Sequence, residues 1–246
     1  MDKGSPQQSA ISTAAIFGAS GGIGRALAET LRQRGVHVWA GSRSTPDTKL
    51  SGAAAFRFDL TDENSIKAAA GQMRDNPPQL VIAATGILTL ADGTGPERSY
   101  RKLDPQTMME VIQLNTVGPA IIAKHMLPLL PRNSRSIFAA LSARVGSITD
   151  NGLGGWHSYR ASKAALNMLL KNFAIELGRT HKQAIIAGLH PGTVDSELSR
   201  PFQSNLPDGQ LSRPGDAASQ LLDVLDGLTP ADSGRIFAYD GQRIAP

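Results

Sequence analysis

Tyr159 and Lys163 stand four residues apart in a segment with helical periodicity, a spacing that puts a phenol and an ammonium group on one helical face. A cation beside a phenol favours the phenolate, so we expect Lys163 to lower the pKa of Tyr159 from about 10 toward neutrality. Tyr159 would then serve as a general acid or base near physiological pH. A Tyr-x-x-x-Lys pair that stands alone is more often structural, so its meaning depends on further polar residues.

Two such residues lie upstream of the pair. Ser142 directly follows the apolar segment 136–141, and a hydroxyl at the end of a strand can hydrogen-bond the carbonyl of a substrate. Asn115 lies within 105–129, where we expect one long helix; asparagine is a mediocre helix former, and its plain alternative is an exposed helix residue. Ser142 lacks the G-x-S-x-G setting of a hydrolase nucleophile. The set therefore favours acid/base chemistry over acyl transfer.

A glycine-rich loop follows the first apolar segment, 13–17, and opens the expected helix 23–34. Glycines between a strand and a helix permit a tight turn and let a pyrophosphate approach the helix N-terminus. A surface loop is the plainer explanation of glycines alone, but this setting favours a dinucleotide. The loop residues that we expect to contact it are Gly18, Ser20, Gly22, Ile23 and Gly24.

Strands and helices alternate along the rest of the chain. We expect strands over 36–40, 54–58, 80–84, 136–141, 184–189 and 235–239, and helices over 62–73, 105–129, 159–178 and 214–225. Crossovers of this length join parallel strands. The sequence therefore predicts an α/β Rossmann fold: a single domain over 12–246, with a doubly wound parallel sheet of about seven strands and helices on both faces. A flexible N-terminal tail, 1–11, precedes it, and ligands should bind at the carboxyl ends of the strands.

The residues after the second strand select the cofactor. An NAD site places a carboxylate there to bind the ribose 2′-hydroxyl, whereas this chain has Ser42 followed by Arg43. A guanidinium pairs with a 2′-phosphate, and no carboxylate repels it. We therefore predict NADP(H); the alternative for Arg43 is a solvated surface arginine.

Taken together, these motifs resemble the short-chain dehydrogenase/reductase family over about residues 12–240. The likeness rests on the G-x-x-x-G-x-G loop and on four residues in the family's order, Asn115, Ser142, Tyr159 and Lys163. The resemblance implies that Tyr159 exchanges a proton with a carbonyl or alcohol while hydride passes to or from the nicotinamide. It implies that Lys163 also binds ribose, that Ser142 polarises the carbonyl, and that Asn115 holds a water linking Lys163 to solvent.

The same resemblance assigns further cofactor contacts. Asp59 matches the position that binds the adenine amino group, with capping of the helix near residue 62 as its alternative. Two departures stand out: Phe17 replaces a common threonine before the loop, and 83–86 reads Ala-Ala-Thr-Gly where the family usually has Asn-Asn-Ala-Gly. The remaining expected contacts are Leu60, Ala84, Thr85 and Gly86 beside the adenosine and Pro191, Gly192 and Val194 beside the nicotinamide.

Two segments bear on the substrate. The stretch 153–159, with Ser142 and its followers, resembles the C-factor and sniffer-like carbonyl reductase branch of the family. Trp156 and His157 either line the pocket beside Tyr159 or pack in the ordinary way. The segment 193–213, rich in serine, proline, leucine and glycine, is expected to form a mobile lid that determines specificity.

Composition narrows the possible partners and location. The chain of 246 residues has no cysteine, which fits a reducing compartment, and we expect a cytoplasmic protein. The net charge is +4, but no basic block indicates nucleic acid, no apolar run indicates a membrane span, and no histidine set indicates a metal. Apolar residues wrap around the expected helices 105–129 and 159–178, which in the family pair across a two-fold axis, so we expect a homodimer or homotetramer. A second hypothesis remains open, an NADP(H)-binding signalling or regulatory protein with little turnover.

Overall fold

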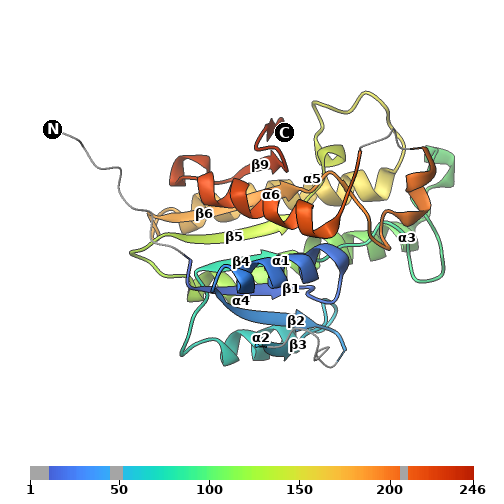
Figure 1. The fold of residues 1–246 in the computed structure, drawn as a ribbon. Coiled ribbons are helices and arrows are strands. Elements are labelled where there is room, and N and C mark those ends of the chain that lie inside the picture. The colour runs from blue at the N-terminus through green and yellow to red at the C-terminus, as the bar shows by residue number, and fades with distance from the viewer. Residues whose placement is uncertain (1–10, 45–51, 206–209) are drawn as a thin grey trace.

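In the computed structural model, which describes residues 11–44, 52–205 and 210–246, an eight-stranded sheet carries helices on both faces (Figure 1). The strand order is β3-β2-β1-β4-β5-β6-β9-β10, and neighbouring strands are parallel except β9 and β10. The predicted Rossmann fold is therefore confirmed. The strands are β1 (Thr13–Phe17), β2 (His37–Ser42), β3 (Ala54–Arg57), β4 (Leu80–Ala83), β5 (Ser136–Leu141), β6 (Ala184–His190), β9 (Arg235–Ala238) and β10 (Arg243–Ile244).

The described part of the sheet has eight strands, which agrees with the predicted number of about seven; the last is the antiparallel β10, which spans only two residues and shows no periodicity. One strand boundary needs correction. Strand β2 runs to Ser42 instead of ending at residue 40. The expected tail, 1–11, lies outside the described residues except for Ile11, which packs against the core and so belongs to the domain.

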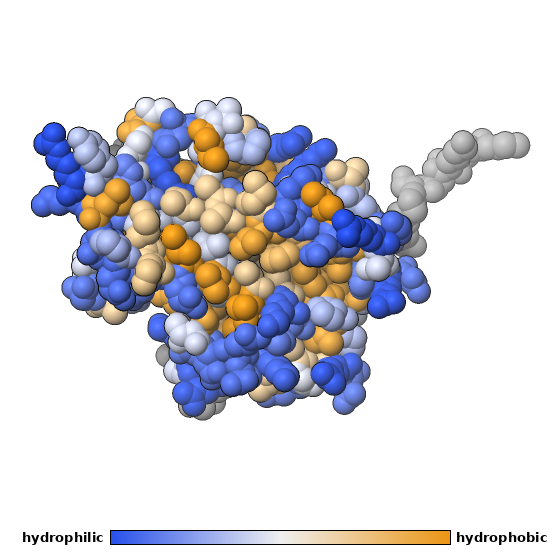
Figure 2. Space-filling model, turned by 180° about the vertical axis from the view of Figure 1, so that it is seen from behind, coloured by the Kyte–Doolittle hydropathy of each residue, from blue (hydrophilic) through white to orange (hydrophobic). Residues whose placement is uncertain are grey.

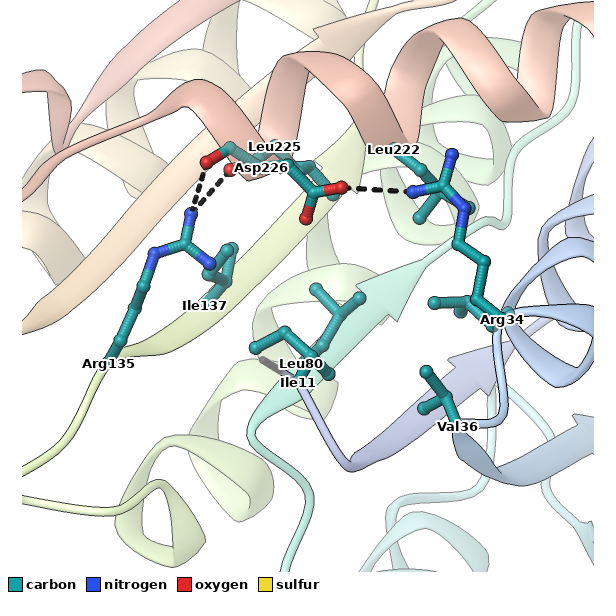
Figure 3. A pocket seen from close by; sticks show the side chains of 10 residues that line it. Ile11, Arg34, Val36, Leu80, Arg135, Ile137, Leu222, Leu225 and Asp226 are labelled. Carbon is teal, nitrogen blue, oxygen red and sulfur yellow. Dashed lines mark hydrogen bonds and ion pairs between the residues drawn. The ribbon is translucent and has the colours of Figure 1, made fainter. Parts of the chain in front are cut away.

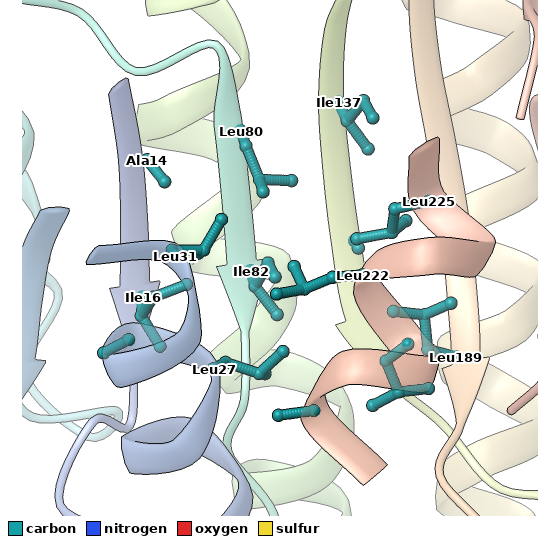
Figure 4. Packing of buried hydrophobic residues seen from close by; sticks show 14 of the residues in the cluster. Ala14, Ile16, Leu27, Leu31, Leu80, Ile82, Ile137, Leu189, Leu222 and Leu225 are labelled. Atoms are coloured by element: carbon teal, nitrogen blue, oxygen red, sulfur yellow. The ribbon is translucent and has the colours of Figure 1, made fainter. Parts of the chain in front are cut away.

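Two layers of helices cover the sheet, and each has its own core. Helices α1 (Gly22–Gln33) and α6 (Pro214–Gly227) pack on one face, and α2 (Glu63–Gln72), α4 (Gly118–Met126) and α5 (His157–Leu177) pack on the other. Side chains of a strand alternate between the faces: Ile16 joins the first core and Phe17 the second. Figure 4 shows Leu27 and Leu222 meeting over Ile82 in the first core.

The expected helix over 105–129 is wrong in one respect, since it is broken at its middle. Helix α3 (Pro105–Ile112) passes into a π-helical turn, Gln113–Val117, before α4 and a 3₁₀ turn, Leu127–Leu129. Pro119 explains the break, because proline has no N–H to donate to the carbonyl of residue 115 and its ring crowds that carbonyl. Gly118 adds to it: a Cβ there would lie 2.8 Å from Leu60 Cδ2.

A cavity of about 300 Å³ lies at the amino ends of the strands, far from the edge where ligands of such sheets bind (Figure 3). Its charged groups are already paired within the chain. Arg34 binds Asp223 at 2.7 Å and Asp226 at 2.9 Å, and Arg135 Nη2 donates to backbone carbonyls at the end of α6, that of Leu225 at 2.7 Å. These contacts fasten α6 to α1 and β5.

Across the described ranges, no helix is long and apolar enough to cross a membrane.

Candidate active site

The glycine loop lies where the strand order changes direction, between β1 and β4. Gly18 has φ 100°, and a Cβ there would lie 2.8 Å from the carbonyl oxygen of Ala84 at the end of β4. A Cβ at Gly24 would lie 2.1 Å from the carbonyl oxygen of Gly18. In the described ranges no side chain caps the start of α1, and the first N–H groups of a helix favour an anion. Such a cradle fits a pyrophosphate.

Phe17 explains why the chain departs from a threonine before this loop. Its ring is fully buried and meets the rings of Phe56 and Phe58 edge to face, at centroid distances of 4.9 and 5.0 Å. Gly41 belongs to the same cluster, because a Cβ there would lie 2.2 Å from the Phe56 ring. Aromatic packing thus closes the loop's apolar side.

Thr85 and Gly86 form the wall that follows β4. The Thr85 hydroxyl is buried and has no hydrogen-bond partner among the described residues, a state that costs about 1–3 kcal/mol and that a ligand hydroxyl would relieve. A Cβ at Gly86 would lie 3.2 Å from Asn115 Oδ1 and 3.3 Å from Lys163 Nζ. The residues present therefore fit a dinucleotide that runs from the glycine loop past Gly86 toward Lys163.

Arg43 is exposed directly after β2, and a second arginine, Arg57, lies nearby. Ser42 closes the strand, is buried, and donates its hydroxyl to the Ser44 carbonyl at 2.8 Å. Arg57 lies beside Ser42 in the neighbouring strand β3, a position that the sequence did not reveal because it depends on strand register. Arg43 and Arg57 therefore put two positive charges near the carboxyl ends of β2 and β3, within electrostatic reach of Asp59.

Asp59 is poised beside these cations. Its Oδ1 accepts hydrogen bonds from the Thr61 N–H at 2.8 Å and the Thr61 hydroxyl at 2.7 Å, and these bonds lower its pKa, with a smaller contribution from the charges of Arg43 and Arg57. The alternative role as a helix cap is wrong, since Asp62 caps α2 by accepting from the Asn64 N–H.

Asn115 lies in the π-helical turn and is fully buried, so the alternative of an exposed helix residue is wrong. Its Oδ1 accepts from the Ile87 N–H at 2.7 Å, and its Nδ2 donates to the Ile87 carbonyl at 2.9 Å and to the Ser162 hydroxyl at 3.2 Å. Thr116 adds a bond to the Ser162 carbonyl at 2.8 Å. The turn thus joins the chain after β4 to α5; the relay-water role of Asn115 stays a prediction.

Tyr159 and Lys163 lie on one face of α5, with Lys163 Nζ 5.7 Å from the centre of the Tyr159 ring. Lys163 is buried and donates to the Leu141 carbonyl at 2.8 Å. Burial lowers the pKa of Lys163 to about 8 and raises the pKa of Tyr159 to about 12. The expectation that Lys163 lowers the pKa of Tyr159 is therefore wrong for this arrangement, because desolvation of the phenolate outweighs a cation at this distance.

Ser142 is buried one residue beyond the carbonyl that holds Lys163. Its hydroxyl donates to Asn167 Oδ1 at 2.6 Å. Asn167 was missed from sequence, although a helical signal existed: it stands four residues after Lys163 and eight after Tyr159, on their face of α5. Close packing holds this region together, because a Cβ at Gly146 would lie 2.7 Å from Lys163 Cβ.

The other predicted positions surround these groups. Trp156 meets the Tyr159 ring edge to face at 6.2 Å, so it borders the phenol, while His157 is the first residue of α5. After β6, Pro191, Gly192 (φ 73°) and buried Val194 lead into a pair of two-residue strands, β7 (Thr193–Val194) and β8 (Leu211–Ser212). Leu60 packs on Gly118, Ser20 is exposed and Ile23 is half-buried.

The expected lid begins over the glycine loop. A Cβ at Gly22 would lie 3.3 Å from Ser196 Cβ, so the segment after β7 covers the start of α1. A 3₁₀ helix, Arg200–Asn205, follows, and residues 206–209 lie outside the described ranges. Mobility of the lid stays a prediction.

Among the residues that the structure describes, no group of three histidine or acidic side chains could hold a metal ion.

Comparison with known proteins defines the class of this fold and site. The family model described as short chain dehydrogenase matches residues 12–207. The chain is 32% identical to 1-hydroxy-2-glutathionyl-2-methyl-3-butene dehydrogenase of Rhodococcus sp. (strain AD45), over 94% of this chain and 98% of that protein. It is 31% identical to the C-signal protein of Myxococcus xanthus, over 73% of this chain and 99% of that protein. The chain belongs to the short-chain dehydrogenase/reductase family.

Solved structures agree with this assignment. The carbonyl reductase Sniffer of D. melanogaster superposes with a TM-score of 0.82 at 22% identity, over 96% of this chain and 100% of that one. A short-chain dehydrogenase/reductase from Burkholderia multivorans with bound NADP gives a TM-score of 0.80 at 25% identity, with the same coverage. The C-signal relative supports the predicted C-factor branch, and the Sniffer structure shows the same fold.

The buried ammonium of Lys163 should make stability depend on pH. Its pKa is about 8 in the folded chain and 10.5 ordinarily, so between these values the unfolded chain binds a proton that the folded chain does not, and stability must rise with pH. From pH 7 to pH 10 we expect the free energy of unfolding to gain about 2–3 kcal/mol in the parent relative to Lys163→Met.

Urea unfolding at both pH values measures this difference. The range stops at pH 10 because Tyr159 has a pKa of 10 ordinarily and about 12 in the folded chain. Between these two values Tyr159 makes the free energy of unfolding fall as the pH rises. Parallel pH dependence in the parent and in Lys163→Met would mean that Lys163 is not desolvated in the folded chain.

Proposed function

We propose that the protein is an NADP(H)-dependent oxidoreductase that interconverts a small-molecule carbonyl and its alcohol. One observation carries the proposal: Lys163 bonds the end of β5 next to Ser142, lies 5.7 Å from the centre of the Tyr159 ring and borders Gly86 together with Asn115, beside a glycine cradle that fits a dinucleotide. Membership of the dehydrogenase family supports the reaction class. A binding protein has no physical need for a half-buried tyrosine beside a buried lysine.

Each residue has a defined task in this proposal. When bound, the nicotinamide supplies or accepts the hydride. Tyr159 exchanges the proton at the substrate oxygen, and burial keeps its phenol protonated at neutral pH, the form that donates to a carbonyl undergoing reduction. The Ser142 hydroxyl, which donates to Asn167 Oδ1, would turn to donate to the substrate carbonyl and so polarise it, and Lys163 would bind ribose while it holds the Leu141 carbonyl.

Preference for NADP(H) rests on the end of β2. Ser42 occupies the place where a carboxylate would bind an NAD ribose, and the guanidinium groups of Arg43 and Arg57 offer positive charge to a 2′-phosphate. The Burkholderia multivorans relative of known structure holds NADP. A cytoplasmic location, where NADP(H) would be reduced and available, remains our prediction.

We also propose that the protein is a homodimer or homotetramer. Figure 2 shows the side opposite to Figure 1, with a broad pale-to-orange area in its middle. Large apolar side chains of α3, the π-helical turn and α5 are exposed, with exposed fractions of 61% for Met109, 37% for Val117, 62% for Met168 and 52% for Ile175. An isologous contact between two copies would bury such side chains.

Tyr159→Phe should fold and bind NADPH as the parent does but lose at least about a hundredfold in turnover, because it removes the exchangeable proton. The assay follows NADPH absorbance against a panel of aldehydes, ketones, quinones and diketones. Tyr100→Phe, at a 66% exposed tyrosine, serves as the matched control. Turnover of Tyr159→Phe within a few-fold of the parent would favour the alternative, an NADP(H)-binding regulatory protein.

Arg43→Leu should remove most of a roughly ten- to hundredfold preference for NADPH over NADH, since a charge-assisted contact contributes about 1.5–3 kcal/mol. Ser42→Asp should go further by repelling the 2′-phosphate. Dissociation constants from fluorescence titration at fixed salt measure both, with the exposed Arg74→Leu as control. If the ratio of the NADH and NADPH dissociation constants is unchanged in Arg43→Leu, then Arg43 contacts solvent and not the 2′-phosphate.

Light scattering at micromolar concentration should find two or four copies. Replacing Met168 and Ile175 with lysine should yield monomers, because two charges would be buried in the contact. Leu153→Lys, at a 93% exposed leucine of a loop, should leave the assembly intact. A monomeric parent would rule out the proposed oligomer and leave the proposed chemistry standing.

A further inference from the structure

Glu97 is a buried carboxylate in the connection between β4 and α3, and only 7% of it is exposed. Its Oε2 accepts from the Ser158 N–H at 3.1 Å, and its Oε1 accepts from the Ser158 hydroxyl. Its backbone carbonyl accepts from the Trp156 N–H at 2.5 Å. One residue thus binds three donors at the start of α5, from 61 positions away in the chain.

The start of α5 needs such support. Gly154, Gly155 and Trp156 have φ values of 65°, 67° and 51°, and in the described ranges Trp156 is the one residue other than glycine with a positive φ. A left-handed conformation costs such a residue about 1–3 kcal/mol and persists where its surroundings hold it. Trp156 stands at the N-cap, where serine, threonine, aspartate or asparagine would usually accept a bond from the helix. The carboxylate of Glu97 takes over that task.

The charge of Glu97 suits this place. Burial, the largest single effect, would raise the pKa of Glu97, but hydrogen bonds from Ser158 and from its own backbone N–H, with the charge of His157, together lower that pKa, so the carboxylate is ionised at neutral pH. A negative charge at the beginning of a helix is favoured by the helix dipole. Glu97 therefore holds the start of α5 by charge as well as by hydrogen bonds.

Glu97 also lies next to the proton-exchanging group. Ser158 immediately precedes Tyr159, and the Trp156 ring stands edge-on to the Tyr159 ring at 6.2 Å. A small cavity beside the phenol is bordered by Glu97, Ser158 and Tyr159 together with apolar side chains such as Leu88 and Val111. Movement of Glu97 would therefore displace Ser158 and Tyr159 together with the residues that line this cavity.

We propose that Glu97 is a positioning residue of the reaction: its backbone carbonyl and its carboxylate hold Trp156 and Ser158 at the start of α5 and so fix the direction of the neighbouring Tyr159 phenol. This inference rests on the proposed function, because it assigns Glu97 a task in the proton exchange. Misplacement of a reacting group by about 1 Å can cost about a hundredfold in rate.

The experiment compares Glu97→Gln, Glu97→Ala and Ser158→Ala with Glu110→Gln, the last at an exposed glutamate of α3. We expect kcat for carbonyl reduction to fall about a hundredfold in Glu97→Ala, about tenfold in Glu97→Gln and a few-fold in Ser158→Ala. The dissociation constant of NADPH should stay within twofold, because the glycine cradle is untouched. Glu110→Gln should match the parent.

Tryptophan emission gives a second readout that does not require turnover. In a Trp39→Phe background Trp156 is the remaining tryptophan, and its emission should shift to the red in both Glu97 variants as the ring leaves Tyr159. Melting temperatures are recorded alongside. If Glu97→Ala fails to fold, Glu97→Gln and Ser158→Ala decide the matter.

The outcomes separate cleanly. Lower melting temperature with unchanged kcat and unchanged emission would overturn the inference and make Glu97 a stabilising helix cap. Lower kcat with shifted emission and intact NADPH binding supports it. A parent that binds NADPH but reduces no carbonyl would overturn the proposed function, and an unshifted Trp156 emission in Glu97→Gln would then overturn the holding role of Glu97 as well.

Discussion

A buried ammonium group needs a polar partner, and the bond from Lys163 Nζ to the Leu141 carbonyl is the contact around which the site is arranged. It ties α5 to the carboxyl end of β5. The bond requires the helix to approach closely, and Gly146 and Gly86 allow this, since a Cβ at either would meet Lys163 atoms. Asn115, held by its bonds to Ile87, approaches Gly86 as Lys163 does. Without the ammonium, the bond that draws α5 against the end of β5 would be absent.

Local patterns predicted most of the fold because each regular element carries its own signal. The strands around β1, β4 and β5 are continuous apolar runs, and the glycines after β1 have conformations and contacts that other residues could not take up. Ser142, Tyr159 and Lys163 stood out for a similar reason, since Ser142 follows a strand end and the other two share a helical face. The family resemblance then supplied roles that spacing alone did not.

What the sequence could not reveal depends on contacts between distant segments. Glu97 meets Ser158 across 61 positions, and Arg57 joins the end of β2 only through strand register. The break at Gln113–Val117 required weighing Pro119 against an otherwise helical pattern. The pKa of Tyr159 went the other way from expectation because spacing indicates which charges are near but not how much water is excluded.

The π-helical turn has a consequence for the two faces of this helix pair. A turn that holds one extra residue offsets everything before it by about 100° from the course of an unbroken α-helix. Because of that offset, α3 presents itself to α5 while α4 packs on the sheet, and Asn115 points inward at the join. The length of the π-helical turn therefore sets the rotation of α3 about its axis. Shortening 113–117 by a single residue would rotate all of α3. Such a change would turn Asn115 away from Ile87 even though Asn115, Ser142, Tyr159 and Lys163 keep their side chains.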